Sequence, residues 1–139
     1  MANTLRLEIV TPEARTYSDD VDMVVLPGVE GELGIFPQHV PLLTELKPGE
    51  LRVLKNGQEI ALAVGEGFVE ITAGHVSVLT DMAIEESAID ENAVQAAIER
   101  AEAAMRDSQT LAGEELATVQ AALQKSLAQL KVKRRHRGG

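Results

Sequence analysis

The sequence contains no cysteine and no tryptophan, and Tyr17, Phe36 and Phe68 are its only aromatic residues. Without cysteine, disulfides and thiolate metal sites are excluded. With so few aromatic residues the core must be aliphatic, and we expect Tyr17 and Phe68 to belong to it. No stretch reaches the roughly 18 consecutive apolar residues of a membrane-spanning helix, and the N-terminus has no signal-peptide pattern. We therefore expect membrane association only through partners.

Basic residues are scarce except at the C-terminus. The net charge is −9, yet the last nine residues carry five of the thirteen Lys and Arg residues and no acid. Residues 1–130 thus hold eight basic residues against 22 acids, which disfavours binding to nucleic acid. The basic tail has two interpretations: it attracts an acidic partner, or it is a frayed, solvated end that offsets a helix dipole.

Residues 1–86 have the pattern of an antiparallel β-sandwich or barrel of about ten short strands. Leu5, Leu7 and Ile9 alternate with polar residues, and a second strand is expected from Ala14 to about Leu26. Asn56-Gly57 is a strong hairpin signal, because type I′ turns need positive φ at both central positions.

Residues 87–139 predict an antiparallel two-helix hairpin, so the whole chain is mainly β with an α-helical C-terminal domain. Helix one is expected over residues 90–106, capped by Ser87 or Asp90, and helix two over residues 114–131. The predicted buried stripe of helix one is mostly alanine: Ile89, Ala93, Ala96, Ala97, Ala101, Ala104 and Met105. That of helix two contains Leu116, Val119, Leu123, Leu127 and Leu130. Alanine contributes little apolar area, so the hairpin should depend on docking elsewhere and is a natural movable element.

The stretch Pro27–Pro41 (PGVEGELGIFPQHVP) has the densest backbone constraints in the chain. Its glycines permit positive φ, and its prolines remove amide donors, so we expect a shaped surface loop rather than a central strand. Motifs for metalloproteases, nucleotide-binding loops and nucleophile elbows are absent from the sequence. Glu30 and Glu32 leave one enzymatic alternative, a small hydrolase with paired carboxylates.

The same stretch resembles the epsilon subunit of bacterial F-type ATP synthases. The resemblance rests on Pro27-Gly-x-Glu-Gly-Glu-x-Gly-x-x-Pro-x-His-x-Pro-Leu-Leu-Thr44, on Lys47-Pro48-Gly49, on AQLKV at residues 128–132, and on the order of the two domains. It implies a central-stalk subunit that has no catalytic activity of its own. Such a subunit couples ion translocation to ATP synthesis and lies peripherally on the cytoplasmic side of the bacterial plasma membrane. A free-standing β-sandwich adaptor, unrelated to ATP synthesis, is the alternative.

The resemblance also assigns partners. The sandwich, residues 1–86, would bind the gamma subunit and the c-subunit ring, with contacts from Glu30, Gly31, Glu32, His39 and Pro41. The hairpin, residues 87–139, would lie folded on the sandwich or extend into the alpha/beta catalytic head and inhibit ATP hydrolysis. Its candidate contacts to beta are Lys125, Lys131, Lys133, Arg134, Arg135 and Arg137.

Some members of that family bind ATP through an Ile/Leu-Asp-x-x-Arg-Ala motif at the start of helix one. This chain keeps Ile89 and Asp90 and has Arg100 at a further basic position, but Ala93 replaces the arginine and Val94 the alanine. The loss of a cation near a triphosphate weakens binding. We therefore expect ATP binding to be weak or absent, and no cofactor to be required.

Overall fold

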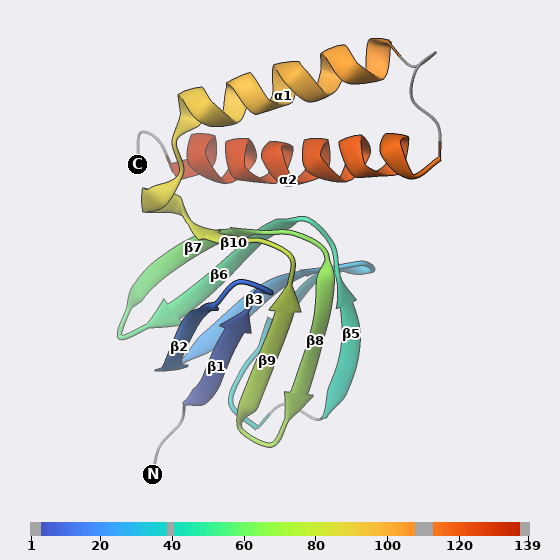
Figure 1. Ribbon diagram of the computed structural model, residues 1–139. Helices are drawn as coiled ribbons and strands as arrows, with labels where there is room; N and C mark the ends of the chain where they lie inside the picture. The colour runs from blue at the N-terminus through green and yellow to red at the C-terminus, as the bar shows by residue number, and fades with distance from the viewer. Residues whose placement is uncertain (1–3, 39–40, 108–112, 137–139) are drawn as a thin grey trace.

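The fold is one curled β-sheet followed by a helical hairpin, which confirms the predicted fold class (Figure 1). The computed structural model describes residues 4–38, 41–107 and 113–136. The strands are β1 (Leu5–Val10), β2 (Arg15–Val21), β3 (Met23–Gly28), β4 (Gly31–Ile35), β5 (Leu42–Leu46), β6 (Gly49–Lys55), β7 (Gln58–Val64), β8 (Gly67–Thr72), β9 (His75–Thr80) and β10 (Ala83–Glu85). A 3₁₀ turn, η1 (Glu86–Ala88), leads into α1 (Glu91–Arg106) and α2 (Glu114–His136).

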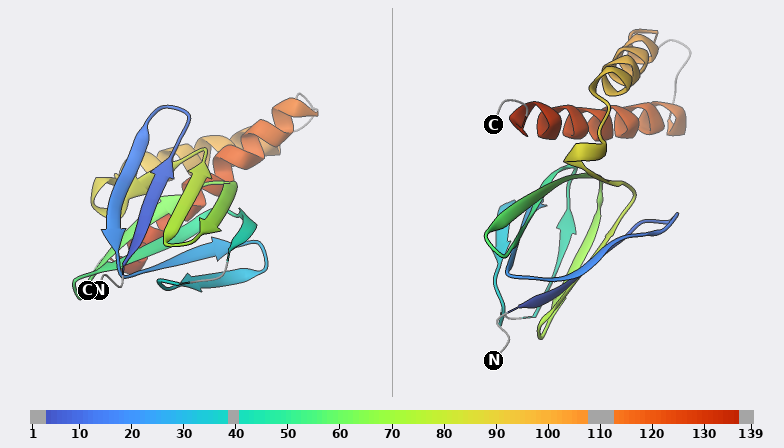
Figure 2. Two further views of the ribbon diagram at one scale, coloured as in Figure 1. Left: turned by 90° about the horizontal axis from the view of Figure 1, so that it is seen from below. Right: turned by 90° about the vertical axis from the view of Figure 1, so that its left-hand side faces the viewer.

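The strands form one sheet in the order β10-β7-β6-β3-β5-β8-β9-β1-β2, with β4 paired to β3. Pairing is antiparallel throughout the described residues except between β1 and β9. The sheet curls so that its two halves face each other (Figure 2). Near the closure, Asp22 N donates to Leu54 O at 2.8 Å, and Lys55 forms an ion pair with Asp19. The hydrogen bond that Lys55 donates to Asp19 within this ion pair lowers the pKa of Asp19 and raises the pKa of Lys55.

The core inside the sheet is aliphatic, as predicted. Leu7, Ile9, Leu51 and Leu62 have no exposed surface, and Tyr17 packs against their cluster. Burial is the main reason that the pKa of Tyr17 is raised. Phe68 contradicts the prediction, because 53% of it is exposed on β8, where alternation turns it away from buried Val69.

Two local predictions in the sheet have different outcomes. The type I′ signal is confirmed, since Asn56 and Gly57 have φ of 53° and 77° between β6 and β7. The single strand expected from Ala14 to Leu26 is instead β2 and β3, separated at Asp22. The Asp22 carboxylate accepts a hydrogen bond from Asn56 N at 2.8 Å, a contact between distant residues that redirects the chain there.

Helix α1 begins where Asp90 caps it, as expected. The Asp90 carboxylate accepts a hydrogen bond from Ala93 N at 3.2 Å. The predicted stripe of helix one is right in part: Ile89 and Ala101 are buried, and Ala93 is exposed. Its other members, Ala96, Ala97, Ala104 and Met105, are partly buried. The stripe missed Val94 and Ile98, which are buried in α1. The larger side chains take the buried face because they remove more apolar area from water.

Helix α2 is longer than predicted and ends at His136 rather than near residue 131. Its buried residues are Ala128 and Val132, whereas Leu127 is 39% exposed. The last turn is therefore helical, and the interpretation of residues 131–136 as a frayed end is wrong. The cause lies in ion pairs with the sandwich, described below.

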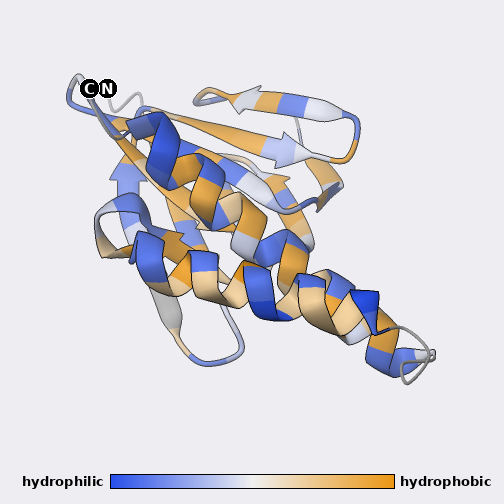
Figure 3. Ribbon diagram, turned by 90° about the horizontal axis from the view of Figure 1, so that it is seen from above, coloured by the Kyte–Doolittle hydropathy of each residue, from blue (hydrophilic) through white to orange (hydrophobic). Residues whose placement is uncertain are grey.

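The hairpin lies outside the sheet, with α2 next to β6 and β7 and α1 stacked on α2 (Figure 1). On the side seen in Figure 3, hydrophilic residues alternate with apolar ones along both helices. In the part of the chain that the structure describes, neither helix combines the length and apolarity needed to cross a membrane. The helical hairpin thus contacts the sandwich mainly through α2, on β6 and β7.

Candidate functional site

The first part of the Gly/Pro stretch, residues 27–35, belongs to a β-hairpin rather than to the shaped surface loop expected. Pro27 and Gly28 belong to β3, and residues 31–35 form β4, with Gly28 paired to Gly31. Pro27 lies beyond the pairing of β3 with β6, which ends at Val25, and its partner strand β4 lies off the main path of the sheet, so a proline is accommodated here. Gly31 has a φ of 122°, and a Cβ at Gly28 would lie 3.0 Å from Gly31 O, so both positions suit glycine.

The turn of this hairpin is anchored to the end of β5. Val29 N donates to Glu45 O at 3.3 Å, and Lys47 N donates to Pro27 O at 2.9 Å. Glu30 is exposed in the turn. Glu32 Oε2 accepts from Arg52 Nη2 at 3.2 Å. The predicted site residues Glu30, Gly31 and Glu32 therefore lie together, on a backbone held at both ends.

The other two predicted residues of this site are less informative. Pro41 is exposed directly before β5. His39 lies outside the described residues.

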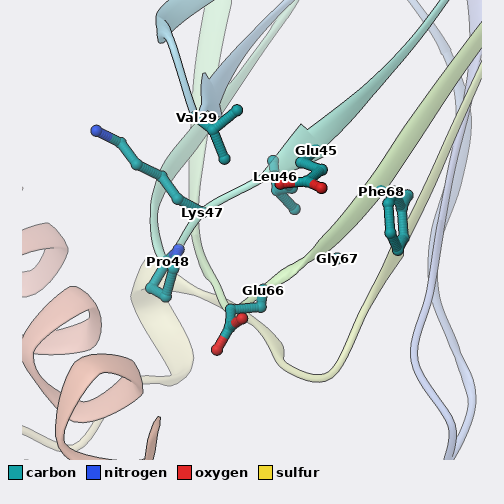
Figure 4. Close-up of a pocket in the computed structure, with 8 residues that line it drawn as sticks. All are labelled: Val29, Glu45, Leu46, Lys47, Pro48, Glu66, Gly67 and Phe68. Atoms are coloured by element: carbon teal, nitrogen blue, oxygen red, sulfur yellow. The ribbon is translucent and has the colours of Figure 1, made fainter. Parts of the chain in front are cut away.

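An apolar patch adjoins the anchored turn. Strand register places Leu43 (β5), Phe68 (β8) and Leu79 (β9) on the outer face of the sheet, because Glu45 pairs with Phe68 and Phe68 with Leu79. Their exposed fractions are 67%, 53% and 53%. Phe68 and Val29 also line a hollow of about 380 Å³ (Figure 4). Clustered exposed apolar side chains are typical of an interaction surface.

The helical hairpin of α1 and α2 docks on the sandwich through a second, smaller apolar cluster. Along β7, Leu62 and Val64 point into the main core, while Ala61 and Ala63 point out towards the helices. The side chains packed against these alanines come from the hairpin and its connection: Ile89, Val94, Ile98 and Val132. Alanine on the sheet side keeps this contact small.

Polar contacts hold the end of α2 to β6. Glu50 accepts hydrogen bonds from Arg135 and, at 2.8 Å, from His136 Nε2. Glu50 is on the outer face of β6, and its side chain is only 12% exposed. Two groups from α2 thus converge on one largely buried carboxylate.

The remaining candidate basic residues are mostly paired as well. Lys125 lies 3.7 Å from Asp81, Lys133 lies 3.3 Å from Glu86, and Arg134 lies 3.8 Å from Glu91. Lys131 is exposed and lines a cleft of about 830 Å³ between α2 and the sandwich. Arg137 lies outside the described residues. In this conformation the charges predicted to face a partner mainly face the protein itself.

The residues of the expected weak ATP motif are structural in part. Ile89 is buried in the docking cluster, and Asp90 uses its carboxylate to cap α1. Arg100 is exposed on α1. Ala93, in the place of the family's arginine, is exposed near the cap and brings no cation.

Sequence reasoning missed Glu50, Arg52 and His136, and it placed Phe68 in the core. Ion pairs between residues about 80 positions apart leave no local pattern. The exposure of Phe68 was readable in principle, because strict alternation in residues 67–72 puts Phe68 opposite Val69 and Ile71.

Comparison with known proteins covers both parts of the chain. Residues 4–86 match the family described as ATP synthase, Delta/Epsilon chain, beta-sandwich domain, and residues 87–134 match the long alpha-helix domain of the same chain. The ATP synthase epsilon chain of Herpetosiphon aurantiacus is 44% identical over 92% of this chain and 93% of its own length. That of Laribacter hongkongensis is 40% identical over 93% and 92%. In the Euglena gracilis mitochondrial ATP synthase structure (OSCP/F1/c-ring), one chain has a similar fold, with a TM-score of 0.75 at 22% identity over 92% of this chain and 80% of that one.

Proposed function

The chain belongs to the ATP synthase delta/epsilon chain family, and we propose that it is a non-catalytic central-stalk subunit coupling ion flow to ATP synthesis. The observation that carries this proposal is the match of both domains to ATP synthase epsilon chains over nearly the full length. The free-standing adaptor and the paired-carboxylate hydrolase lack comparable support. The subunit would lie peripherally at the cytoplasmic side of a bacterial plasma membrane and reach the membrane only through its partners.

The sandwich is the proposed rotor-binding domain. The anchored β3–β4 turn carries Glu32 and adjoins the apolar patch of Leu43, Phe68 and Leu79. A rigid polar turn beside an apolar surface suits a permanent contact, since apolar area gives affinity and the charged turn gives register. The gamma subunit is the proposed partner of the apolar patch, and the polar loops of the c ring are the proposed partner of Glu32.

The hairpin is the proposed regulatory domain, inhibiting ATP hydrolysis when it extends into the alpha/beta head. Support comes from the small docking cluster and from the use of Lys125, Lys133, Arg134 and Arg135 in ion pairs within the chain. The same cations are needed to face acidic segments of beta. Docking and inhibition therefore compete for one set of charges, so the two positions of the hairpin exclude each other.

Deletion of residues 88–139 tests the regulatory part. In an ATP synthase reconstituted from otherwise intact subunits, the truncated protein should raise the rate of ATP hydrolysis, while proton or sodium pumping driven by ATP stays coupled. The full-length chain in the same complex is the control. Unchanged hydrolysis would refute inhibition, and loss of binding to gamma and the c ring would refute the assignment of the sandwich.

Weak ATP binding is the matching proposal for the hairpin. Titration calorimetry of the full chain with ATP should give a dissociation constant weaker than the micromolar range. Ala93→Arg, which restores the cation of the family motif, should strengthen binding, because a charge-assisted hydrogen bond to phosphate adds roughly 1.5–3 kcal/mol. Micromolar or tighter binding by the unaltered chain would contradict this proposal.

A further inference from the structure

Arg52 lies among three carboxylates on the outer face of the sandwich. Its Nη2 is 3.2 Å from Glu32 Oε2, and its Nε is 3.9 Å from Glu50 Oε1 and 3.8 Å from Glu59 Oε1. The Arg52 side chain is 22% exposed and Glu50 is 12% exposed, whereas Glu32 is 65% exposed. The cation thus bridges an accessible acid on the anchored turn and a largely buried acid beneath the hairpin.

The guanidinium of Arg52 lacks a hydrogen bond at Nε, the atom that faces Glu50 and Glu59. Among the buried side-chain nitrogen and oxygen atoms of the described residues, Arg52 Nε is the one that lacks a hydrogen-bond partner. The nearest acceptors, at 3.8 and 3.9 Å, lie beyond hydrogen-bond distance. A buried, unsatisfied donor is costly, so a small movement that closes the gap to Glu59 or to Glu50 is favourable once the bond to Glu32 is released. Glu50 is the more buried of these two acids, so a cation beside it is screened less by water.

The oxygen that Arg52 approaches is already in use. Glu50 Oε1 accepts a hydrogen bond from Arg135 Nη1 of α2, and the other oxygen of Glu50 accepts from His136. Arg52 and Arg135 therefore face the same oxygen of Glu50. That oxygen has a second lone pair, but the two guanidinium charges repel each other when both approach it. While Arg52 is bound to Glu32, Glu50 remains available to Arg135 and His136 at the end of α2.

We propose that Glu32, Arg52 and Glu50 form a charge relay through which occupation of Glu32 by a cationic group of a partner loosens the hairpin. When the partner neutralises Glu32, Arg52 turns to Glu50 and displaces Arg135. The β3–β4 turn and the end of α2 are then linked without direct contact between them. The regulatory meaning of this relay rests on the proposed function, because it would let docking on the rotor release the regulatory helices.

The expected coupling is modest, because the outer link is an exposed ion pair. Such pairs contribute about 0.2–1 kcal/mol, which converts to a change of about 1.4- to 5-fold in an equilibrium constant. An effect of this size shifts the balance between two positions of the hairpin without dictating it. The relay therefore tunes docking rather than switching it completely.

Thiol labelling of the isolated full-length chain measures the relay. Because the sequence has no cysteine, Ala61→Cys introduces a single thiol on β7, beneath the docked helices. Its labelling rate by a soluble maleimide follows the opening equilibrium of the hairpin. The variants are Glu32→Gln, which imitates neutralisation by a partner, and Glu30→Gln, a matched control on the same turn with the same loss of charge. Both are also made with Arg52→Gln.

The relay predicts that Glu32→Gln raises the labelling rate about 1.4- to 5-fold, whereas Glu30→Gln leaves it unchanged. With Arg52→Gln present, Glu32→Gln should have no further effect. Three results would overturn the relay: no effect of Glu32→Gln, an equal effect of Glu30→Gln, or an effect of Glu32→Gln that persists without Arg52. Hydrogen exchange of the α2 amides in the chain without Ala61→Cys repeats the comparison, which guards against disturbance by the new cysteine.

Failure of the relay and failure of the proposed function are separable. The labelling experiment uses the chain alone and measures no ATP hydrolysis. Unchanged labelling would remove the relay and leave inhibition by the hairpin intact. An ATP synthase whose hydrolysis ignores deletion of residues 88–139 would remove the inhibition and leave the physical coupling between Glu32 and the hairpin standing.

Discussion

The two faces of β7 show how differently the sandwich and the hairpin are held. Leu62 and Val64 face inward and are fully buried in a cluster of Leu, Ile and Val, while Ala61 and Ala63 face outward under the helices. Inside, large side chains supply the stability. Outside, a small apolar contact is supplemented by ion pairs to Glu50, Asp81 and Glu86. One strand therefore contributes to a large apolar core on one face and to a small apolar contact on the other.

The largest expected effect is a loss of sandwich stability when a buried core residue, rather than an exposed one, is truncated. Leu62→Ala should lower the free energy of unfolding by about 3 kcal/mol, because it removes buried apolar area and leaves a cavity. Tyr17 is the only tyrosine and lies in the sandwich, so its fluorescence during urea unfolding reports this domain alone. Leu43→Ala on the exposed patch is the matched control and should change stability by less than about 0.5 kcal/mol. Equal losses would contradict the assignment of the core.

Val132→Ala should loosen the hairpin and leave the sandwich unaffected. Val132 is 1% exposed in the docking cluster, so we expect a loss of about 1.5 kcal/mol in docking, which is roughly a tenfold rise in hydrogen exchange of the helix amides. The Tyr17 unfolding midpoint should stay the same. Leu127→Ala, at a position that is 39% exposed, should change exchange much less. A simultaneous drop in sandwich stability would mean that the two regions form one cooperative unit.

Glu50→Gln should have a smaller effect of the same kind. It removes the charge that attracts Arg135 and His136, and charge-assisted hydrogen bonds at a partly exposed site contribute about 1 kcal/mol. Glu66→Gln is the control, because Glu66 lines the same cleft between α2 and the sandwich. Hydrogen exchange of α2 should rise several-fold for Glu50→Gln only. An equal rise in both variants would reduce the contact to nonspecific charge.

The smallest expected effect concerns the pair of Asp19 and Lys55, which belongs to the sandwich. Lys55 lowers the pKa of Asp19 below its ordinary 3.8, so stability from Asp19 is present above that value and is lost as the pH falls through the lowered pKa. The pKa of Lys55 is raised above 10.5, so its contribution is lost only as the pH rises through that raised value. Asp19→Asn should therefore destabilise the sandwich slightly at pH 7, and the effect should shrink as the pH falls towards 2. A larger effect at pH 2 would contradict the pair.

Local patterns predicted the elements that depend on nearby residues. The Asn56-Gly57 turn, the Asp90 cap and the alternating aliphatic strands follow from backbone preference and period. The errors lie where distant groups decide the structure. Helix α2 continues to His136 because Glu50, some 85 positions earlier, binds its last turn. The stretch from Pro27 forms a hairpin because Glu45 and Lys47 anchor its turn.

The residues of the candidate site could be proposed from the sequence, but their contacts with one another could not. The loop motif indicated that Glu32 faces a partner, and the basic residues of α2 were recognised as a group. Their present partners were not predictable, since ion pairs such as Arg52 with Glu32 depend on strand register. Register follows from the whole sheet, not from any single segment.

A reversible tether gives the most direct test of the claim that the hairpin is detachable and inhibitory. Cysteines replacing Glu50 and Arg135, whose long side chains meet tip to tip, would be joined by a bis-maleimide linker with a disulfide in its spacer, which ties β6 to α2 and is cut by reduction. In a reconstituted ATP synthase carrying this variant, we predict faster ATP hydrolysis with the tether closed and slower hydrolysis after a reductant opens it. Identical rates before and after reduction, with formation of the cross-link verified, would contradict the account.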